Sequence, residues 1–157
     1  IIYTVMNLGA FAVIIAVARK TRSAELGTWG GLFEYAPGLA VLMSVFLFAL
    51  AGIPPLGGWF AKFQVFRAVV GADTVAGYAM GVIVAVNSVI ALYYYANIAK
   101  QLSFEPNPDG DTTTIRVPSA LVIALGVTAI ATIVFGMFPG TVGHFGDAAT
   151  DLLAVAG

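Results

Sequence analysis

The chain has 157 residues, of which 60% are hydrophobic and only 10% are charged. Since water-soluble domains carry about 25% charged residues, this chain has too few charges to cover a surface that faces water. The net charge of −1 argues against nucleic-acid binding, because no basic cluster is available to neutralise a run of phosphates. Without cysteine, the chain cannot hold disulfides, thiolate zinc sites or cysteine-bound iron–sulfur clusters, so any redox cofactor must lie elsewhere. The composition indicates an integral membrane protein.

Four apolar segments follow one another along the chain and define the expected fold. They cover residues 1–18, 37–71, 77–102 and 117–138. Each is close to or above the roughly 20 residues that an α-helix needs to cross about 30 Å of hydrocarbon. We therefore expect an all-α integral membrane protein, a single transmembrane region over residues 1–157 with about four spans. Because the chain begins Ile1-Ile2 without Met or a basic leader, we expect a fragment that starts near the beginning of a helix.

The first segment carries a small polar patch. Tyr3 and Asn7 are four residues apart and therefore share one face of a helix. This patch fits either hydrogen bonds to a neighbouring helix or contact with a chain of water molecules. The sequence alone leaves both alternatives open.

The loop charges decide how the second segment is counted. Five of the seven basic residues lie in or beside the loops 19–36 and 103–116: Arg19, Lys20, Arg22, Lys100 and Arg116. The strips 72–76 and 139–157 carry no Lys or Arg, which is the positive-inside pattern with the two basic loops cytoplasmic. Two separate spans within 37–71 would place the second basic loop outside, so this segment is predicted to be one span and 139–157 an outer tail.

The second span is predicted to be broken from Gly52 to Gly58. Pro54 and Pro55 lack amide protons and their rings disfavour helix before them, while Gly57 and Gly58 let the backbone leave helical geometry. Irregular backbone at membrane depth is tolerated only where it is buried in protein or lines a hydrated cavity. Broken helices recur in ion-coupled transporters. The alternative is a proline kink that serves packing only.

Lys62 is the principal candidate for a functional residue. It lies 11 residues before Asp73, so about 16 Å of helix separates it from the outer end of its span and places it near mid-bilayer. A charge at that depth costs a few kcal/mol, so it is a functional hypothesis by default. We therefore interpret Lys62 as a proton relay rather than a packing residue. Arg67 is nearer the membrane surface and is expected to reach it along its own stem.

The third segment, 77–102, adds weaker candidates. Asn87 and Tyr94 are seven residues apart, face the same way, and are candidates for supporting a water wire. Tyr95 is interpreted as an interfacial anchor, the usual role of tyrosine near the end of a span. Lys100 fits either an ordinary flanking charge or a point where protons would enter.

The rest of the chain offers no site. The last segment, 117–138, is uncharged and reads as a packing helix. The acids of the loop 103–116 do not have the spacing of a calcium-binding EF-hand loop. His144, in the tail, is interpreted as a solvated or interfacial side chain. No metal or cofactor is therefore expected in this chain.

Three runs of residues carry a resemblance to a known family. They are YTVMNLGAF at 3–11, LAGIPPLGGWFAKF at 50–63 and ALYYY at 91–95. Together they resemble subunit N of the proton-pumping NADH:quinone oxidoreductase, respiratory complex I. The resemblance covers nearly the whole chain, as the last four of that family's fourteen helices, and the middle run is its most specific part.

The resemblance implies a role for Lys62 and limits it. In these antiporter-like subunits the twelfth helix is broken and carries a titratable residue, which matches Lys62 here. The resemblance implies that Lys62 passes protons through the half-channel facing the outside. The family's other key groups, a glutamate and two lysines on earlier helices, have no counterpart in this sequence.

The resemblance also implies the setting and its alternatives. NAD, FMN, iron–sulfur clusters and quinone are expected elsewhere in the complex, with other complex I membrane subunits and the lipid bilayer as partners. Frequent Ala, Gly and Val favour a bacterial cell (inner) membrane. The alternatives are a subunit of a multisubunit Na⁺/H⁺ antiporter or of a membrane-bound hydrogenase, or a structural membrane scaffold.

Overall fold

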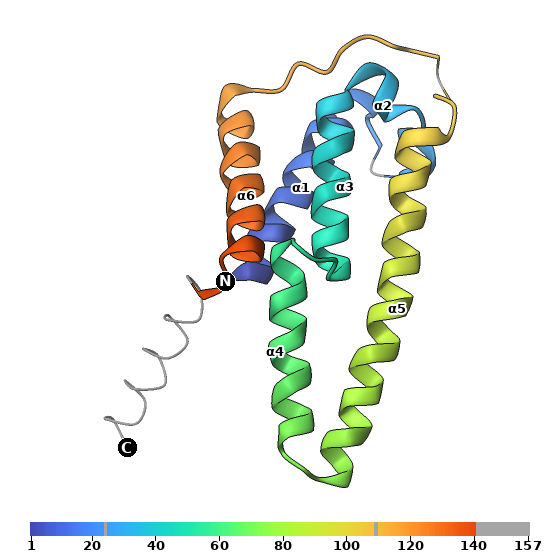
Figure 1. Cartoon of the computed structure of the whole chain (residues 1–157). Coiled ribbons are helices and arrows are strands. Elements are labelled where there is room, and N and C mark those ends of the chain that lie inside the picture. The colour runs from blue at the N-terminus through green and yellow to red at the C-terminus, as the bar shows by residue number, and fades with distance from the viewer. Residues whose placement is uncertain (24, 109, 141–157) are drawn as a thin grey trace.

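The structure is a computed structural model that describes residues 1–23, 25–108 and 110–140. Its helices are α1 (Ile2–Thr21), the 3₁₀ helix η1 (Leu26–Trp29), α2 (Leu32–Tyr35), α3 (Pro37–Ala51), α4 (Gly57–Gly71), α5 (Val75–Phe104) and α6 (Ser119–Met137) (Figure 1). The described residues form no strand, so the expected all-α class is confirmed. His144 and most of the tail expected to be outer lie outside the described residues.

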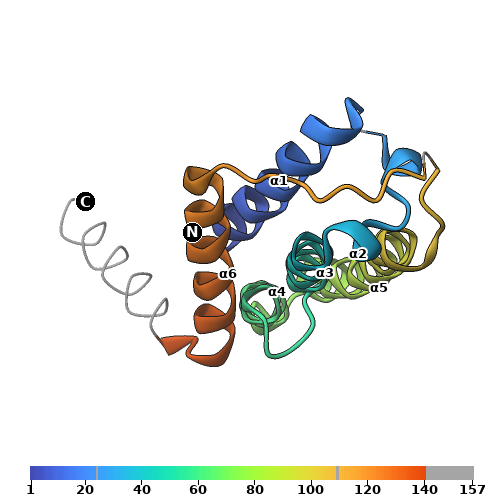
Figure 2. The ribbon, with the colours of Figure 1, turned by 90° about the horizontal axis from the view of Figure 1, so that it is seen from above.

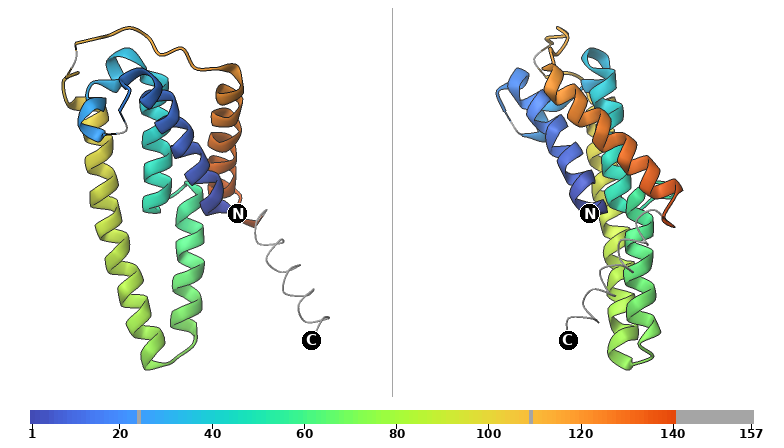
Figure 3. Two further views of the ribbon diagram at one scale, coloured as in Figure 1. Left: turned by 180° about the vertical axis from the view of Figure 1, so that it is seen from behind. Right: turned by 90° about the vertical axis from the view of Figure 1, so that its left-hand side faces the viewer.

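The second apolar segment forms two helices in place of one. Among the described residues, three helices, α1, α5 and α6, are long and apolar enough to cross a membrane, and α3 is a shorter apolar helix. With 15 residues each, α3 and α4 measure about 22 Å and are too short to cross alone. They follow one another along the length of α5 (Figures 1 and 3). The predicted interruption of the second segment is therefore confirmed, but it is shorter than expected: it covers residues 52–56, and Gly57 and Gly58 already belong to α4.

Local sequence explains where α3 begins and ends. Pro37, which has no amide proton, occupies the first turn of α3. After the last turn, Gly52 has a φ of +92°, a left-handed conformation that glycine adopts at little cost. Its N–H donates to the carbonyls of Phe48 and Ala49, which closes the last turn. The chain then leaves helical geometry until Gly57, where α4 starts.

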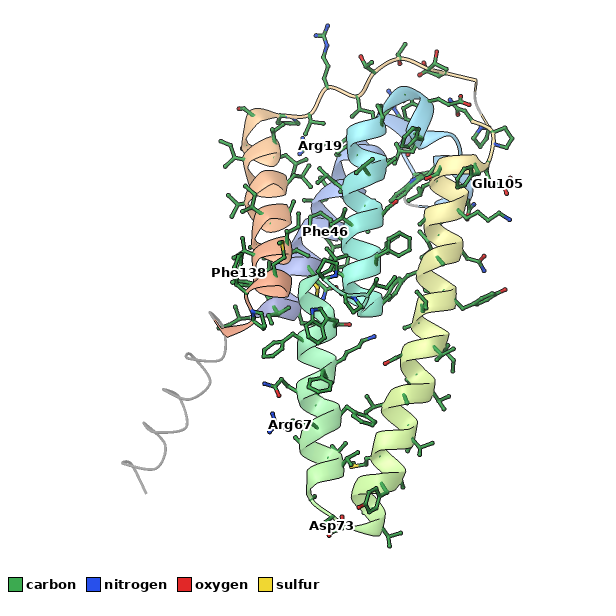
Figure 4. All side chains as sticks on the ribbon, in the orientation of Figure 1. Arg19, Phe46, Arg67, Asp73, Glu105 and Phe138 are labelled. Carbon is green, nitrogen blue, oxygen red and sulfur yellow. The ribbon has the colours of Figure 1, made fainter. Side chains whose placement is uncertain are left out.

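The core lies at the loop end of the molecule, between α1, α3, α6 and the last turns of α5. The largest fully buried side chains are Trp29, Phe46, Met6, Leu32, Leu102, Val13 and Val17, with the polar Thr132. Trp29 and Leu32 come from the stretch 19–36, which was expected to be a plain loop but contains η1 and α2. These short helices cover the loop end of the core. Asp73 lies at the opposite end, at the tip of the α4–α5 hairpin (Figure 4).

The two basic loops meet at one end of the bundle. The Nζ of Lys20 donates hydrogen bonds to the backbone carbonyls of Asp111, at 2.9 Å, and of Thr113. The same nitrogen lies 3.7 Å from the Asp111 carboxylate and 4.0 Å from the centre of the Tyr35 ring. From there an extended segment crosses the end of the bundle to reach α6 (Figure 2). Both loops therefore face the same side, as the charge pattern required.

Candidate functional site

Close backbone contact shapes the site at the break between α3 and α4. A Cβ placed on Gly58 would overlap the carbonyl oxygen of Ala49, so only glycine lets the first turn of α4 lie against the end of α3. A Cβ on Gly52 would lie 2.9 Å from the Cδ of Lys62. The end of α3 and the start of α4 are therefore in direct contact, and the side chain of Lys62 lies against Gly52.

Lys62 caps the end of α3. Its Nζ donates a hydrogen bond of 2.7 Å to the carbonyl oxygen of Ala51, the last residue of that helix. The final carbonyls of a helix have no partner within it and carry partial negative charge, so an ammonium group there is favoured. Among the described residues, no carboxylate lies within ion-pair distance of Lys62. Within the described part of the chain, the Lys62 amine is thus held by a helix end rather than by an acid.

A pocket of about 530 Å³ opens beside Lys62. It is lined by residues from α1, α3, α4 and α5: Tyr3, Leu50, Ala61, Lys62, Val65, Val84, Asn87, Ser88, Ala91 and Tyr95. One ammonium, one amide and three hydroxyl groups therefore border a mostly apolar hollow. Since one water molecule occupies about 30 Å³ of liquid, the pocket has room for several waters and enough polar groups to order them. Such a site can pass a proton between water and an amine.

The structure brings only part of the predicted set together. Asn87 lines the pocket with Lys62, but Tyr94 does not; its side chain is 58% exposed and its ring meets Tyr95 edge-on at 5.8 Å. Lys100 lies in a separate hollow of about 540 Å³ towards the loop end, with the polar side chains of Asn97 and Gln101. The amide of Asn7 donates to the Tyr3 carbonyl one turn earlier in α1.

Tyr95 has a different position from the one expected. The sequence predicts an interfacial anchor, but Tyr95 packs against the core and lines the Lys62 pocket. It also packs against a second, smaller cluster of buried residues, Ile2, Met6, Ala49 and Leu50. Ser88 also lines the pocket and was not singled out. A signal was present, because Ser88, Ala91 and Tyr95 are spaced three and four residues apart and share one face of α5 with Asn87.

No metal centre accompanies this site in the parts of the chain that the structure covers. There, no group of three or more His, Cys, Asp or Glu side chains is placed to hold a metal ion. The chemistry available in this pocket is that of hydrogen bonds and of one ammonium group.

An interrupted apolar span with a lysine beside the interruption is typical of ion-coupled membrane transporters. Comparison with known proteins gives the family. Residues 1–90 match the family described as NADH:quinone oxidoreductase/Mrp antiporter, transmembrane. The chain belongs to this family. The matched region contains α1, α3, α4 and most of the pocket, including Lys62.

Individual relatives narrow the resemblance to one subunit. The chain is 39% identical over 141 residues to NADH-quinone oxidoreductase subunit N of Brevibacillus brevis, an alignment that covers 89% of this chain and 26% of that protein. It is 37% identical over 160 residues to the protein of the same name from Rhodospirillum rubrum, covering 99% and 31%. It is 40% identical over 152 residues to the protein of the same name from Gluconacetobacter diazotrophicus, an alignment that covers 96% of this chain and 31% of that protein. The chain therefore spans less than a third of these relatives, and its resemblance to subunit N is confirmed.

Proposed function

We propose that this chain is part of a proton-translocating membrane subunit of NADH:quinone oxidoreductase, with Lys62 passing protons in the half-channel that faces outward. The observation that carries the proposal is the position of Lys62. Its ammonium sits at a break in a membrane span, bonded to Ala51 O and beside a polar pocket. The names of the relatives, all subunit N, support the assignment to this complex.

The geometry suggests how the residues divide the work. The carbonyl end of α3 stabilises the charged form of Lys62, so the amine can hold a proton although no carboxylate of the described residues is paired with it. Asn87 and Ser88 border the pocket and would order the waters through which the proton moves. Tyr94 lies next to the pocket-lining Tyr95 and would extend the wire. Lys100, near the loop end, would mark where protons enter from the cytoplasm.

In this proposal, electron transfer takes place outside the chain. NAD, FMN, iron–sulfur clusters and quinone bind to other parts of the complex, whose reaction is the transfer of electrons from NADH to quinone. The chain contributes the coupled proton movement. Its partners are the other membrane subunits and the lipid bilayer, without nucleic acid, and its location is a bacterial inner membrane.

The second candidate is a subunit of a multisubunit Na⁺/H⁺ antiporter or of a membrane-bound hydrogenase. The antiporter alternative is favoured by the family description, which joins NADH:quinone oxidoreductase with the Mrp antiporter. The subunit N names of the relatives and the lysine at position 62 favour the oxidoreductase. The third alternative, a structural scaffold, requires that Lys62 serve only to cap α3.

Substitution of Lys62 by Met in the complete complex separates these alternatives. In sealed membrane vesicles, the number of protons moved per NADH oxidised should fall, while assembly and NADH oxidation persist. Loss of a positioned acid–base group typically costs about 10²-fold or more in its own transfer step. The matched control is Arg67→Met, which removes a charge from the same helix at a residue outside the pocket (Figure 4). An unchanged ratio for Lys62→Met supports the scaffold, and a ratio that depends on Na⁺ supports the antiporter.

A further inference from the structure

The end of α6 rests on the helix break. A Cβ on Gly136 would overlap the carbonyl oxygen of Pro55 and lie 2.6 Å from the Cα of Leu56. The indole Nε1 of Trp59, in the first turn of α4, donates a hydrogen bond of 3.3 Å to the Gly136 carbonyl. The backbone of α6 thus touches the backbone of the break directly, with no side chain between them.

A second contact joins α6 to the start of α4, at Gly57. A Cβ on Gly57 would lie 3.1 Å from the Thr132 carbonyl and 3.1 Å from the Cγ2 of Ile2. Thr132 is fully buried, and its hydroxyl donates to the carbonyl of Thr128 within α6. One turn of α6, from Thr132 to Gly136, therefore faces the first turn of α4.

These contacts determine where Lys62 lies. Lys62 follows Gly57 by five residues, about one and a half turns of a continuous helix, so it moves with the start of α4. The bond from its Nζ to the Ala51 carbonyl is 2.7 Å long, and a separation of 3.6 Å is no longer a hydrogen bond. A displacement of α4 by about 1 Å that the Lys62 side chain does not follow would therefore break this contact.

We propose that Gly136, together with Trp59, is a positioning residue for Lys62. By holding the start of α4 against the end of α3, the uncharged helix α6 keeps the Lys62 amine within reach of Ala51 and the pocket. This inference rests on the proposed role of Lys62 in proton transfer. The three atoms nearest to a methyl group at position 136 are all main-chain atoms of the break, so the helices must move apart to admit it.

Gly136→Ala in the complete complex tests this role against a matched control. The control is Gly126→Ala, which adds the same methyl to the same helix where nothing lies within 4 Å. We expect Gly136→Ala to lower the protons moved per NADH by about 10-fold in the step that uses Lys62, within the range of a 1 Å misplacement. Assembly and NADH oxidation should persist, and Gly126→Ala should match the unmodified complex.

A second variant and a double variant distinguish positioning from packing. Trp59→Phe removes the bond to Gly136 but keeps a ring beside Phe63, and should give a smaller drop in the same ratio. If Gly136→Ala prevents assembly of the complex, the number of protons moved per NADH by the Trp59→Phe complex tests the positioning role instead. In a Lys62→Met background, Gly136→Ala should cause no further drop in the protons moved per NADH, because both changes impair the same transfer step.

The outcomes separate this inference from the proposed function. If Lys62→Met leaves the ratio unchanged, the proposed function is wrong. If Lys62→Met lowers the ratio but assembled Gly136→Ala and Trp59→Phe complexes keep it, only the positioning role is wrong. A further drop in the double variant also contradicts it, since α6 would then act independently of Lys62.

Discussion

The two halves of the interrupted span, α3 and α4, have the same length but are held in different ways. Each has 15 residues; α3 buries eight of them, whereas α4 buries only Gly57 and Gly58. Side chains such as Phe46 fix α3 in the core (Figure 4). Within the described residues, α4 is held at its first turn by backbone contacts and by Lys62, and along its length by α5. The position of α4 therefore depends on the break.

The largest expected effect on stability comes from replacing a phenylalanine by alanine in α3, compared with the same replacement in α4. Phe46→Ala removes a fully buried ring and should cost about 3–5 kcal/mol of stability. Phe63→Ala, in α4, removes a ring that is 50% exposed and should cost well under half of that. The measurement is the unfolding temperature of each variant in detergent. Equal losses would mean that side chains hold α4 as firmly as α3.

A smaller effect is expected at the backbone contact between the halves. Gly58→Ala places a methyl group against the Ala49 carbonyl and should cost about 1–3 kcal/mol, the usual price of overpacking. Gly71→Ala, at the other end of α4, meets nothing within 4 Å and should be neutral or stabilising by up to about 1 kcal/mol. The same unfolding assay applies. If Gly58→Ala is as benign as Gly71→Ala, the first turn does not hold α4.

The smallest effect is expected at the loop end, to which α3 belongs. The backbone N–H of Thr113 and the nearby Lys20 hold the pKa of Asp111 below its ordinary value. A lowered carboxyl pKa stabilises the folded loop above that ordinary value, about 4, and the stabilisation is lost as the pH falls through the lowered pKa. Pepsin cleavage near residue 111 should therefore increase as the pH falls below about 4.

Asp111→Asn is the control for this prediction. The amide does not titrate, so the part of the change in cleavage that is due to Asp111 should disappear in this variant. Cleavage that rises equally in both proteins would show that the loop end is loosened by other groups.

Local signals made much of the fold and part of the site predictable. The break follows from Pro54, Pro55 and the glycines around them, since backbone restrictions act within a few residues. The place of Lys62 beside the break follows from the same run. Asn87 was found because it is polar within an apolar helix. Each of these inferences needs only neighbouring residues.

Contacts between distant segments were not predictable in this way. Gly136 lies about 80 residues after the break that it touches, and no spacing rule connects them. The sequence does not distinguish two roles for Tyr95, because an aromatic residue near the end of a span serves either as an interfacial anchor or as part of a pocket wall. The helices η1 and α2 are four residues each, too short to show a helical period in sequence.

The bonds of Lys20 have a consequence for the order in which the protein is made. They join residues 91 and 93 positions apart, and α1 packs against α6, the last described helix. Helices emerge from the ribosome from the N-terminus onward, so α1 must wait in the bilayer until α6 arrives. During synthesis the Lys20 ammonium therefore lies at the membrane surface without its loop partners, where it can fix the orientation of α1, and it links the two loops only after residues 111–113 have been made.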